Sequence, residues 1–263
     1  MDRPTAAERY FFETNGYLVL ENLLPPERVA ELLERLQVTI AKRRAGQGTP
    51  LQNEQTRAQG LDTRIFHILD DDPVFTDMID PPELTPYIRA LLNETFHFHA
   101  SDAIWEEELK PEGGPGWHMD GRDAGYRGLR PYIPHLQLKV GYFLSDMSEP
   151  DQGNLMLVPG SHRTATEPTP EQLSGYDTFP GAIQVCATAG TAILFHNAMW
   201  HTRGPHTRSG GRRVFLYYAY EQPWMIGNAE HWKYPTEFYN GLSAERRQLF
   251  HGFVFDPPEI REY

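Results

Sequence analysis

The feature that most constrains the fold of this chain is a change in the spacing of its apolar residues near residue 95. Before that point they recur at helical spacing, most clearly in residues 26–46, where Val29, Leu32, Leu36 and Ile40 share one face. After it, short β-type segments alternate with Gly, Pro and Asp. Helices followed by antiparallel strands predict an α+β, mainly β fold in which a sandwich or barrel is buttressed by N-terminal helices.

The expected elements follow from these two patterns. Helices are expected at 6–16, 26–45, 74–92 with breaks at prolines, and near 244–251. Strands are expected at 17–20, 64–69, 96–107, 136–145, 155–158, 182–187, 191–195 and 213–221. A chain of 263 residues is within the range of one all-β domain, so we expect a single domain. It comprises a helical part of about 1–94, a β core of about 95–221 and a C-terminal extension, 222–263.

The charge and the composition limit the classes of molecule that this chain is expected to bind. The formal charge of −12 disfavours nucleic acids and anionic membranes, because binding to phosphates depends on clustered Lys and Arg. The N-terminus lacks an apolar signal segment, and no run of eighteen apolar residues occurs. The single cysteine, Cys186, excludes an intrachain disulfide and fits a reducing compartment. We expect a cytoplasmic protein that acts on a small molecule, without an obligate protein partner.

The stretch GWHMDG carries the first chemical signal. In an extended strand His118 and Asp120 emerge on the same face, so their heteroatoms can converge on one ion. A second histidine from elsewhere would complete the 2-His-1-carboxylate arrangement of non-haem iron(II) oxygenases, which leaves coordination positions open for substrate. The chain must therefore supply one more ligand.

The candidates for this ligand are His196, His201 and His206, which follow an expected strand. We favour His201, which lies where the strand gives way to a turn. An antiparallel hairpin would bring Arg212 and Arg213, at the start of the next strand, back alongside it. The planar fork of an arginine binds a carboxylate through two hydrogen bonds, so a dicarboxylate could be held between the ion and the guanidinium.

Four stretches, in order along the chain, carry a family resemblance. They are FETNGYLVLENLLPPERVAELLERL, the pair His118 and Asp120, SDMSEPDQGNLMLVPGSH, and His201 with Arg212 eleven residues later. In these stretches, from about residue 13 to 220, the chain resembles the phytanoyl-CoA dioxygenase-like iron(II)/2-oxoglutarate oxygenases. The resemblance implies a double-stranded β-helix, a cupin-like jelly roll with helices packed on one sheet.

The resemblance also implies roles for these residues. His118, Asp120 and His201 would bind iron(II), and Arg212 would bind the distal carboxylate of 2-oxoglutarate. With dioxygen, such an enzyme hydroxylates an unactivated C–H bond and releases succinate and carbon dioxide. Asp120 argues against halogenation, because related halogenases have a small residue in its place. Where the family often has a small hydroxyl residue and an asparagine after the distal histidine, this chain has Thr202 and an arginine.

Two assignments around the co-substrate stay open in the sequence. If the register of the last strand shifts by one residue, Arg213 takes the place of Arg212, because a one-residue shift turns every side chain to the other face. Lys139 either faces the cavity and helps to hold a carboxylate, or extends its ammonium to the edge of the sheet.

The substrate is less constrained. Arg122, Arg127 and Arg130 follow the metal motif and either favour an anionic substrate from a covering loop or pair with surface acids. Two or three aromatic residues are expected to line a pocket. The candidates are Trp105, Trp117, Tyr126, Trp200 and Trp224.

Two other functions compete with the oxygenase. His97 and His99 share a strand face and would suit a cupin-type metal protein, an isomerase or another dioxygenase. A non-catalytic binding module on the same fold is the second alternative. His162, in the PGSH stretch, is expected to stabilise a turn and not to bind metal.

Overall fold

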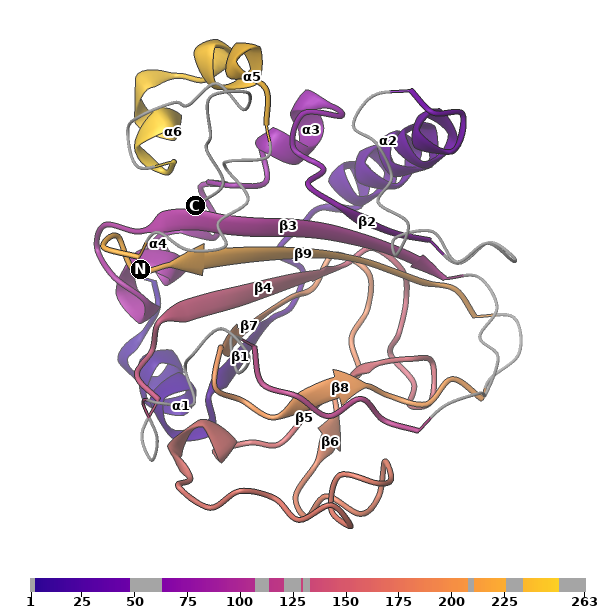
Figure 1. Cartoon of the computed structure of the whole chain (residues 1–263), viewed down its shortest axis with the longest axis vertical. Coiled ribbons are helices and arrows are strands. Elements are labelled where there is room, and N and C mark those ends of the chain that lie inside the picture. Colours follow the sequence, from indigo (N-terminus) through magenta and orange to yellow (C-terminus); the bar gives the residue numbers. More distant parts are fainter. Residues whose placement is uncertain are drawn as a thin grey trace, which may run out of the picture.

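The computed structural model describes residues 3–47, 63–106, 114–120, 129, 133–207, 211–225 and 234–250. Two antiparallel sheets face each other, and most helices cover the outer face of the larger one (Figure 1). The large sheet has the strand order β1-β7-β4-β9-β3-β2 and the small sheet the order β6-β5-β8. The expected α+β architecture, dominated by antiparallel sheets, is confirmed.

The bounds of the elements are as follows. The large sheet contains β1 (Tyr17–Leu20), β2 (Thr63–Phe66), β3 (His97–Glu106), β4 (Gln137–Phe143), β7 (Ala192–His196) and β9 (Arg213–Glu221). The small sheet contains β5 (Leu155–Leu157), β6 (Ile183–Gln184) and β8 (His201–Arg203). The helices are α1 (Ala6–Asn15), α2 (Pro26–Arg44), α3 (Pro73–Thr76), α4 (Thr85–Leu91), α5 (Thr236–Gly241) and α6 (Ala244–Gln248), with a 3-10 turn, η2 (Ser161–Arg163).

The sequence patterns missed two short elements, β8 and α5. Strand β8 has three residues and α5 has six, too few for a hydrophobic period to be recognised. The pairing of β8 with β5, which sets His201 opposite Leu157, defines β8 as a strand.

Helix α1 is bounded by strong local signals at both ends. Thr5 and Glu8 form a capping box at its start, where each side chain accepts a hydrogen bond from the other residue's backbone N–H. Gly16 ends it in the left-handed region, with φ +84°. The carbonyl of Gly16 accepts a hydrogen bond from the backbone of His196, so the end of α1 is tied directly to β7.

The alternation of side chains in β9 separates two layers of core. Val214, Leu216, Tyr218 and Tyr220 belong to the core shared with the helices. Phe215 and Tyr217, on the opposite face, pack in the core between the two sheets, which also contains residues of β5 and β7. Side chains at the odd-numbered positions of β9 are therefore directed towards the small sheet.

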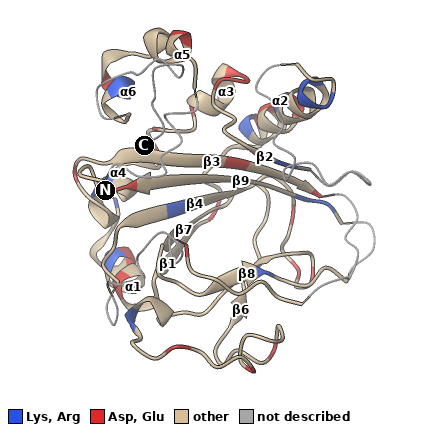
Figure 2. Cartoon of the chain, in the orientation of Figure 1, with Lys and Arg blue, Asp and Glu red and all other residues tan. Residues whose placement is uncertain are grey.

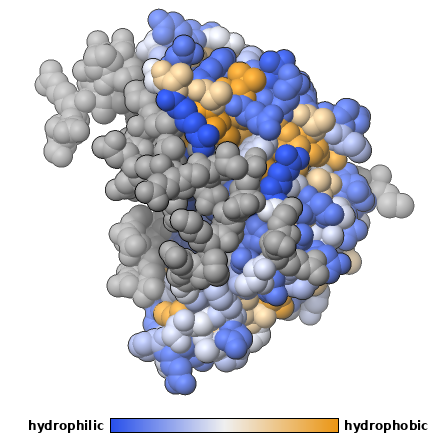
Figure 3. Space-filling model, turned by 90° about the vertical axis from the view of Figure 1, so that its right-hand side faces the viewer, coloured by the Kyte–Doolittle hydropathy of each residue, from blue (hydrophilic) through white to orange (hydrophobic). Residues whose placement is uncertain are grey.

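Charged and hydrophilic residues are common on the surface of the protein. Charged residues occur on the helices and on several strands, and β4 carries a single basic residue, Lys139 (Figure 2). The coloured residues on the face shown in Figure 3 are mostly hydrophilic, with some hydrophobic patches. Among the described residues, no helix combines the length and the apolar character that crossing a membrane requires.

Candidate metal centre

The structure brings the three expected ligands together between the two sheets. His118, Asp120 and His201 each offer an atom, and these atoms lie within 4.8 Å of one another. Nε2 of His118 is 3.8 Å from Oδ1 of Asp120, and Nε2 of His201 is 3.8 Å from Oδ2 of the same carboxylate. We call these three residues the metal cluster. Within the described part of the chain, no other group of three His, Cys, Asp or Glu side chains meets this distance.

Hydrogen bonds to backbone carbonyls orient both imidazoles. Nδ1 of His118 donates to the carbonyl of Gly116 at 2.7 Å, and Nδ1 of His201 donates to the carbonyl of Met199 at 3.0 Å. A carbonyl only accepts, so each Nδ1 carries the proton and each Nε2 keeps its lone pair. Histidines that bind metals usually donate their other ring N–H to a carbonyl or carboxylate in this way.

Long-range backbone pairing positions the cluster. His118 and His201 form an antiparallel bridge, with each backbone N–H donating to the other residue's carbonyl at 3.0 and 2.9 Å. The hydroxyl of Ser161, in the PGSH turn, accepts a hydrogen bond from the backbone N–H of Trp200 at 2.9 Å. The turn therefore fixes the residue immediately before His201. As expected, the neighbouring His162 supports this region, because its Nε2 is 3.2 Å from the carbonyl of Glu13.

Electrostatics keep the carboxylate ionised and the buried imidazole neutral. Burial opposes ionisation of Asp120, but the Lys139 ammonium, 3.5 Å from Oδ2, and the two imidazoles hold the pKa of this carboxyl well below its usual range. Burial lowers the pKa of His201 to about 4, although Asp120 acts in the opposite direction. An ionised carboxylate and neutral imidazoles are the states that bind a metal ion.

This donor set fits a divalent transition metal. Two imidazole nitrogens and one carboxylate oxygen from the same side form the facial arrangement typical of non-haem iron(II), with room for other ligands. The cluster is also accessible, because the His118 side chain is 53% exposed. The three residues can therefore bind an ion while small molecules reach it.

The two candidate arginines differ sharply in position. Arg212 is exposed, and its guanidinium lies 5.5 Å from the ring centre of Trp105, a residue of the helix-side core. Arg213 is 3% exposed and starts the face of β9 that carries Phe215 and Tyr217. The structure thus brings Arg213, and not Arg212, to the space between the sheets.

The surroundings of Arg213 suit a carboxylate. Its guanidinium donates to the hydroxyl of Tyr217 at 3.3 Å and lies 3.4 Å from Glu106. Its Nε is buried, and no hydrogen-bond partner for it exists among the residues that the structure describes. Arg203, on β8, lies 3.5 Å from the same glutamate. A buried donor without a partner costs free energy, so an anionic ligand oxygen at this position would be stabilising.

Other residues singled out in the sequence lie elsewhere. Trp117 and Trp200 pack in a third core behind the small sheet, and Trp224 is 68% exposed. These tryptophans and Trp105 therefore do not form the expected pocket, and an aromatic ring that lies next to His201 is that of Phe195, at 5.1 Å between ring centres. The remaining aromatic candidate and the three arginines of residues 122–130 fall outside the described residues.

The alternative metal pair does not form a cluster. His97 and His99 are absent from the one group whose ligand atoms converge within the described residues, and Nδ1 of His99 is instead 2.7 Å from Glu221. Lys139 contacts Asp120, so the carboxylate that it holds belongs to the protein itself. Sequence reasoning missed Ser161 as a positioning residue, although the PGSH stretch pointed to this turn.

Comparisons with known proteins agree with this geometry. The sequence model of the family described as phytanoyl-CoA dioxygenase (PhyH) matches residues 12–214. The ectoine dioxygenase of Sphingopyxis alaskensis is 25% identical over 260 residues, which cover 88% of this chain and 83% of that protein.

Solved structures with the same fold include some with 2-oxoglutarate bound. HygX from Streptomyces hygroscopicus, with nickel and 2-oxoglutarate bound, has a TM-score of 0.67 at 19% identity and covers 84% of this chain and 88% of that one. The epimerase SnoN, in complex with Fe3+, alpha ketoglutarate and nogalamycin RO, has a TM-score of 0.62 at 17% identity, with 82% and 83% covered.

Proposed function

Because the chain belongs to the phytanoyl-CoA dioxygenase family, we propose that it is an iron(II)- and 2-oxoglutarate-dependent dioxygenase that hydroxylates a small organic substrate. The observation that carries the proposal is the convergence of His118, Asp120 and His201 within 4.8 Å of one another. The relatives support iron(II), 2-oxoglutarate and dioxygen as cofactor and co-substrates, since HygX binds 2-oxoglutarate with nickel and SnoN binds it with iron. When bound, iron(II) would activate dioxygen, which is the oxidant, and 2-oxoglutarate would supply two electrons and leave as succinate and carbon dioxide.

The residues of this chain contribute binding, orientation and shielding from water. His118, Asp120 and His201 hold the ion on one side, and their Nδ1–carbonyl hydrogen bonds keep both Nε2 atoms directed at it. Arg213, with the Tyr217 hydroxyl beside it, binds the distal carboxylate of 2-oxoglutarate. Aromatic and aliphatic side chains of the core between the sheets exclude water from the co-substrate.

Lys139 has a different task from the one that the sequence suggested. Its ammonium lies 3.5 Å from Asp120, so it compensates the charge of the ligand carboxylate and limits its rotation. We therefore place Lys139 as a positioning residue for the metal cluster, and Arg213 in the role that the family spacing assigned to Arg212.

We also propose a specific fold and domain organisation for the chain. We take the two facing sheets as a double-stranded β-helix, the cupin-like jelly roll buttressed by α1 and α2. Residues 1–263 are proposed as a single domain, which is supported by one core that joins α1, α2, the large sheet and residues as far as Phe250.

The type of reaction is proposed separately from the cofactors. Hydroxylation is supported by the ectoine dioxygenases among the relatives and by Asp120, which occupies the position that halogenases leave open. The related fold of the epimerase SnoN provides the competing outcome. Ectoine is therefore the first compound to test, followed by amine, alcohol and acid libraries.

Anaerobic titration tests the proposal. Iron(II) and 2-oxoglutarate should give the weak visible charge-transfer band of the metal-bound keto acid with the natural chain, and none with His118→Ala or Asp120→Ala. A band that survives both substitutions would contradict the ligand assignment. If the band forms but no compound raises succinate release, the chain is a binding module on this fold.

The two arginines allow a matched test of the co-substrate site. Arg213→Gln should raise the KM for 2-oxoglutarate roughly 10- to 100-fold, because a buried charge-assisted contact is lost. Arg212→Gln should leave this KM within about twofold, because its side chain is exposed over Trp105. Succinate formation against 2-oxoglutarate concentration measures both, and the reverse ranking would restore the assignment from the sequence spacing.

A further inference from the structure

A buried acid and a histidine form a pair that the proposed mechanism does not use. Oε2 of Glu221 lies 2.7 Å from Nδ1 of His99, and the Glu221 side chain is 0% exposed. Burial of a carboxylate is costly unless it is paired. The His99 side chain is 15% exposed, so the imidazole lies between the buried acid and the accessible space.

A β-bulge directs His99 to this position. The pairing of β3 with β9 shifts between Phe98 and Ala100, which leaves His99 as the extra residue. Bulges of this kind re-aim side chains and are frequent beside active sites. Without it, the side-chain alternation of β3 would continue uninterrupted through this residue.

Glu221 lies on the face of the large sheet that is directed towards the metal cluster. Glu221 has the parity of Phe215 and Tyr217, whose side chains pack between the two sheets. Its partner in β4 is Gln137, two residues before Lys139, and the Lys139 ammonium contacts Asp120. Arg213 is at the opposite end of β9. The face therefore offers a carboxylate-binding end at Arg213, the metal cluster near Lys139, and an acidic end at Glu221.

The chemistry of this end favours a cation with N–H groups. When Nδ1 donates its proton to Glu221, the second ring nitrogen, Nε2, becomes an acceptor. A pair of one imidazole and one carboxylate that holds a single proton carries one negative charge. A protonated amine satisfies both the acceptor and the charge, whereas a carboxylate satisfies neither.

We propose that the His99–Glu221 pair is the substrate-recognition element of this enzyme and selects substrates that carry a protonated amine. The inference rests on the proposed function and names the substrate class of the same site. His99 contacts the amine, and Glu221 acts through His99 as a positioning residue that fixes its tautomer. The co-substrate occupies the Arg213 end and the substrate the Glu221 end, with the metal cluster between them.

The test measures binding, so it does not depend on turnover. The chain is loaded with nickel(II) and 2-oxoglutarate at pH 8, and matched compounds are titrated by calorimetry. Each of several linear, cyclic and sugar skeletons is supplied as the primary amine, the trimethylammonium, the alcohol and the carboxylate. For at least one skeleton we expect the amine to bind at least about tenfold more tightly than the other three forms.

Substitutions of the two residues then test whether this pair causes the preference for amines. His99→Gln and Glu221→Gln should each reduce amine affinity about tenfold and remove the preference, while 2-oxoglutarate binding is unchanged. His135→Gln, a histidine change on the helix side, is the control and should keep the preference. If Glu221→Gln lowers the melting temperature too far for titration, His99→Gln decides alone.

Each other outcome counts against the proposal. Tighter binding of carboxylates would mean that the pair is protonated and recognises anions, and equal affinities would mean that it recognises neither. A preference for amines that survives both substitutions would place the recognition elsewhere. Failure of every amine to bind, with the iron(II)–2-oxoglutarate band intact, would overturn this inference, whereas loss of the band itself would overturn the proposed function.

Discussion

Among the described residues, two groups of histidines have their rings in contact, and in one of them the ring nitrogens converge with a carboxylate. In the metal cluster, His118 and His201 have ring centres 4.2 Å apart and are tilted by 49°. In the second group, which we call the helix-side cluster, His135 and His196 are 4.3 Å apart and stacked at 15°, and His162 is 4.9 Å from His196. The distances are similar, so proximity of imidazoles does not distinguish them.

The difference lies in the carboxylate and in the direction of the nitrogens. Asp120 lies between the two imidazoles of the metal cluster, whose Nε2 atoms converge on it. In the helix-side cluster, ring nitrogens form hydrogen bonds with the backbone. Nδ1 of His196 accepts a hydrogen bond from the N–H of Ala198, and Nε2 of His162 is hydrogen-bonded to the carbonyl of Glu13. Imidazoles that stack and bind backbone groups stabilise a packing arrangement and do not chelate.

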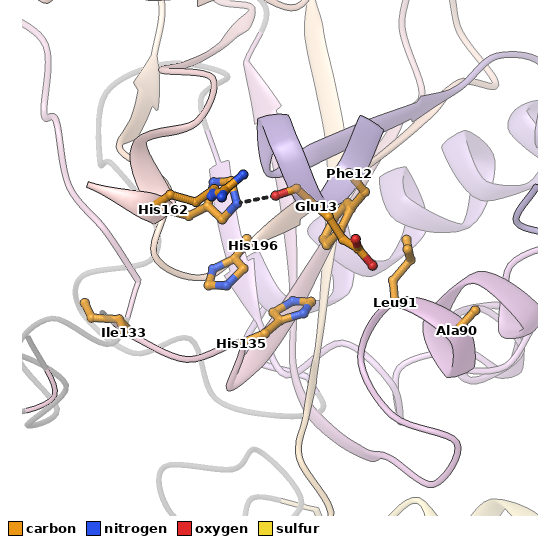
Figure 4. Close-up of a pocket in the computed structure, with 9 residues that line it drawn as sticks. Phe12, Glu13, Ala90, Leu91, Ile133, His135, His162 and His196 are labelled. Atoms are coloured by element: carbon orange, nitrogen blue, oxygen red, sulfur yellow. Dashed lines mark hydrogen bonds between the residues drawn. The ribbon is translucent and has the colours of Figure 1, made fainter. Parts of the chain in front are cut away.

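The helix-side cluster borders a cavity of about 620 Å³ between α1, α4 and η2 (Figure 4). Phe12 and Leu91 supply its apolar wall, and Glu13 and Arg163 are the charged residues that line it. Burial, followed by the neighbouring imidazoles, lowers the pKa of His196 to about 2, and burial lowers that of His135 to about 4. This region therefore tolerates histidines only in their neutral form.

The largest expected effect comes from replacing one histidine in each cluster and comparing the two variants. His201→Gln should reduce succinate formation on the order of 1000-fold, about 4 kcal/mol of barrier, because it removes a metal ligand. His196→Gln should retain turnover but lower the free energy of unfolding by about 2 kcal/mol, because a buried stacked ring is lost. Urea denaturation and turnover are measured on both, and equal losses of turnover would erase the distinction.

Acidification should act mainly through the helix-side cluster. Because the folded-state pKa of His135 is about 4, the unfolded chain binds more protons once the pH falls below the usual value of 6.5. The stability is therefore present above pH 6.5 and is lost as the pH falls towards 4, by about 3 kcal/mol for this residue alone.

Unfolding by urea between pH 7.5 and 5.5 measures this effect before most carboxylates titrate. His135→Gln should flatten the dependence by about 1.4 kcal/mol per pH unit below 6.5. Since His201 also has a lowered pKa, the comparison is made with nickel(II) and 2-oxoglutarate bound, which keep that residue deprotonated. An unchanged slope would mean that His135 is not held neutral by the fold.

The smallest effect concerns the junction between α1 and the helix-side cluster. A Cβ at Gly16 would lie 2.5 Å from Nδ1 of His162, and φ is +84° there. Gly16→Ala should cost about 2 to 3 kcal/mol of stability from strain and overpacking, with the iron(II)–2-oxoglutarate band retained. Gly46→Ala is the matched control, because φ is +72° but nothing lies within 4 Å of its Cβ, and about 1 kcal/mol is expected. Equal melting temperatures for the two variants would show that His162 is not packed tightly.

The sequence predicted best those helices and strands whose hydrophobic pattern continues over many neighbouring residues. Both ends of helix α2 and of strands β3, β4 and β9 were anticipated within two residues, because their patterns span many positions. Strand β8 was not, since three residues carry no period and its pairing with β5 and His118 depends on residues far away in the chain.

The same division holds for the candidate site. His118 and Asp120 are two residues apart, so their shared face could be inferred directly, and family order pointed to His201. The choice between Arg212 and Arg213 could not be made, because an uncertainty of one residue in a strand boundary reverses the face of each side chain. The bulge that re-aims His99 also had no signal in the sequence.

What the sequence by itself determined was the supply of chemical groups and their order: a helical start, a β-rich remainder, a histidine and an aspartate spaced for one strand face, and a later histidine followed by arginines. The tertiary structure decided which of those groups meet. Side-chain direction in a sheet depends on register, and register is set by pairing between strands distant in the chain. For that reason the arginine between the sheets, the partner of Glu221 and the neutral histidines behind α1 emerge only when the two sheets and the helices are assembled.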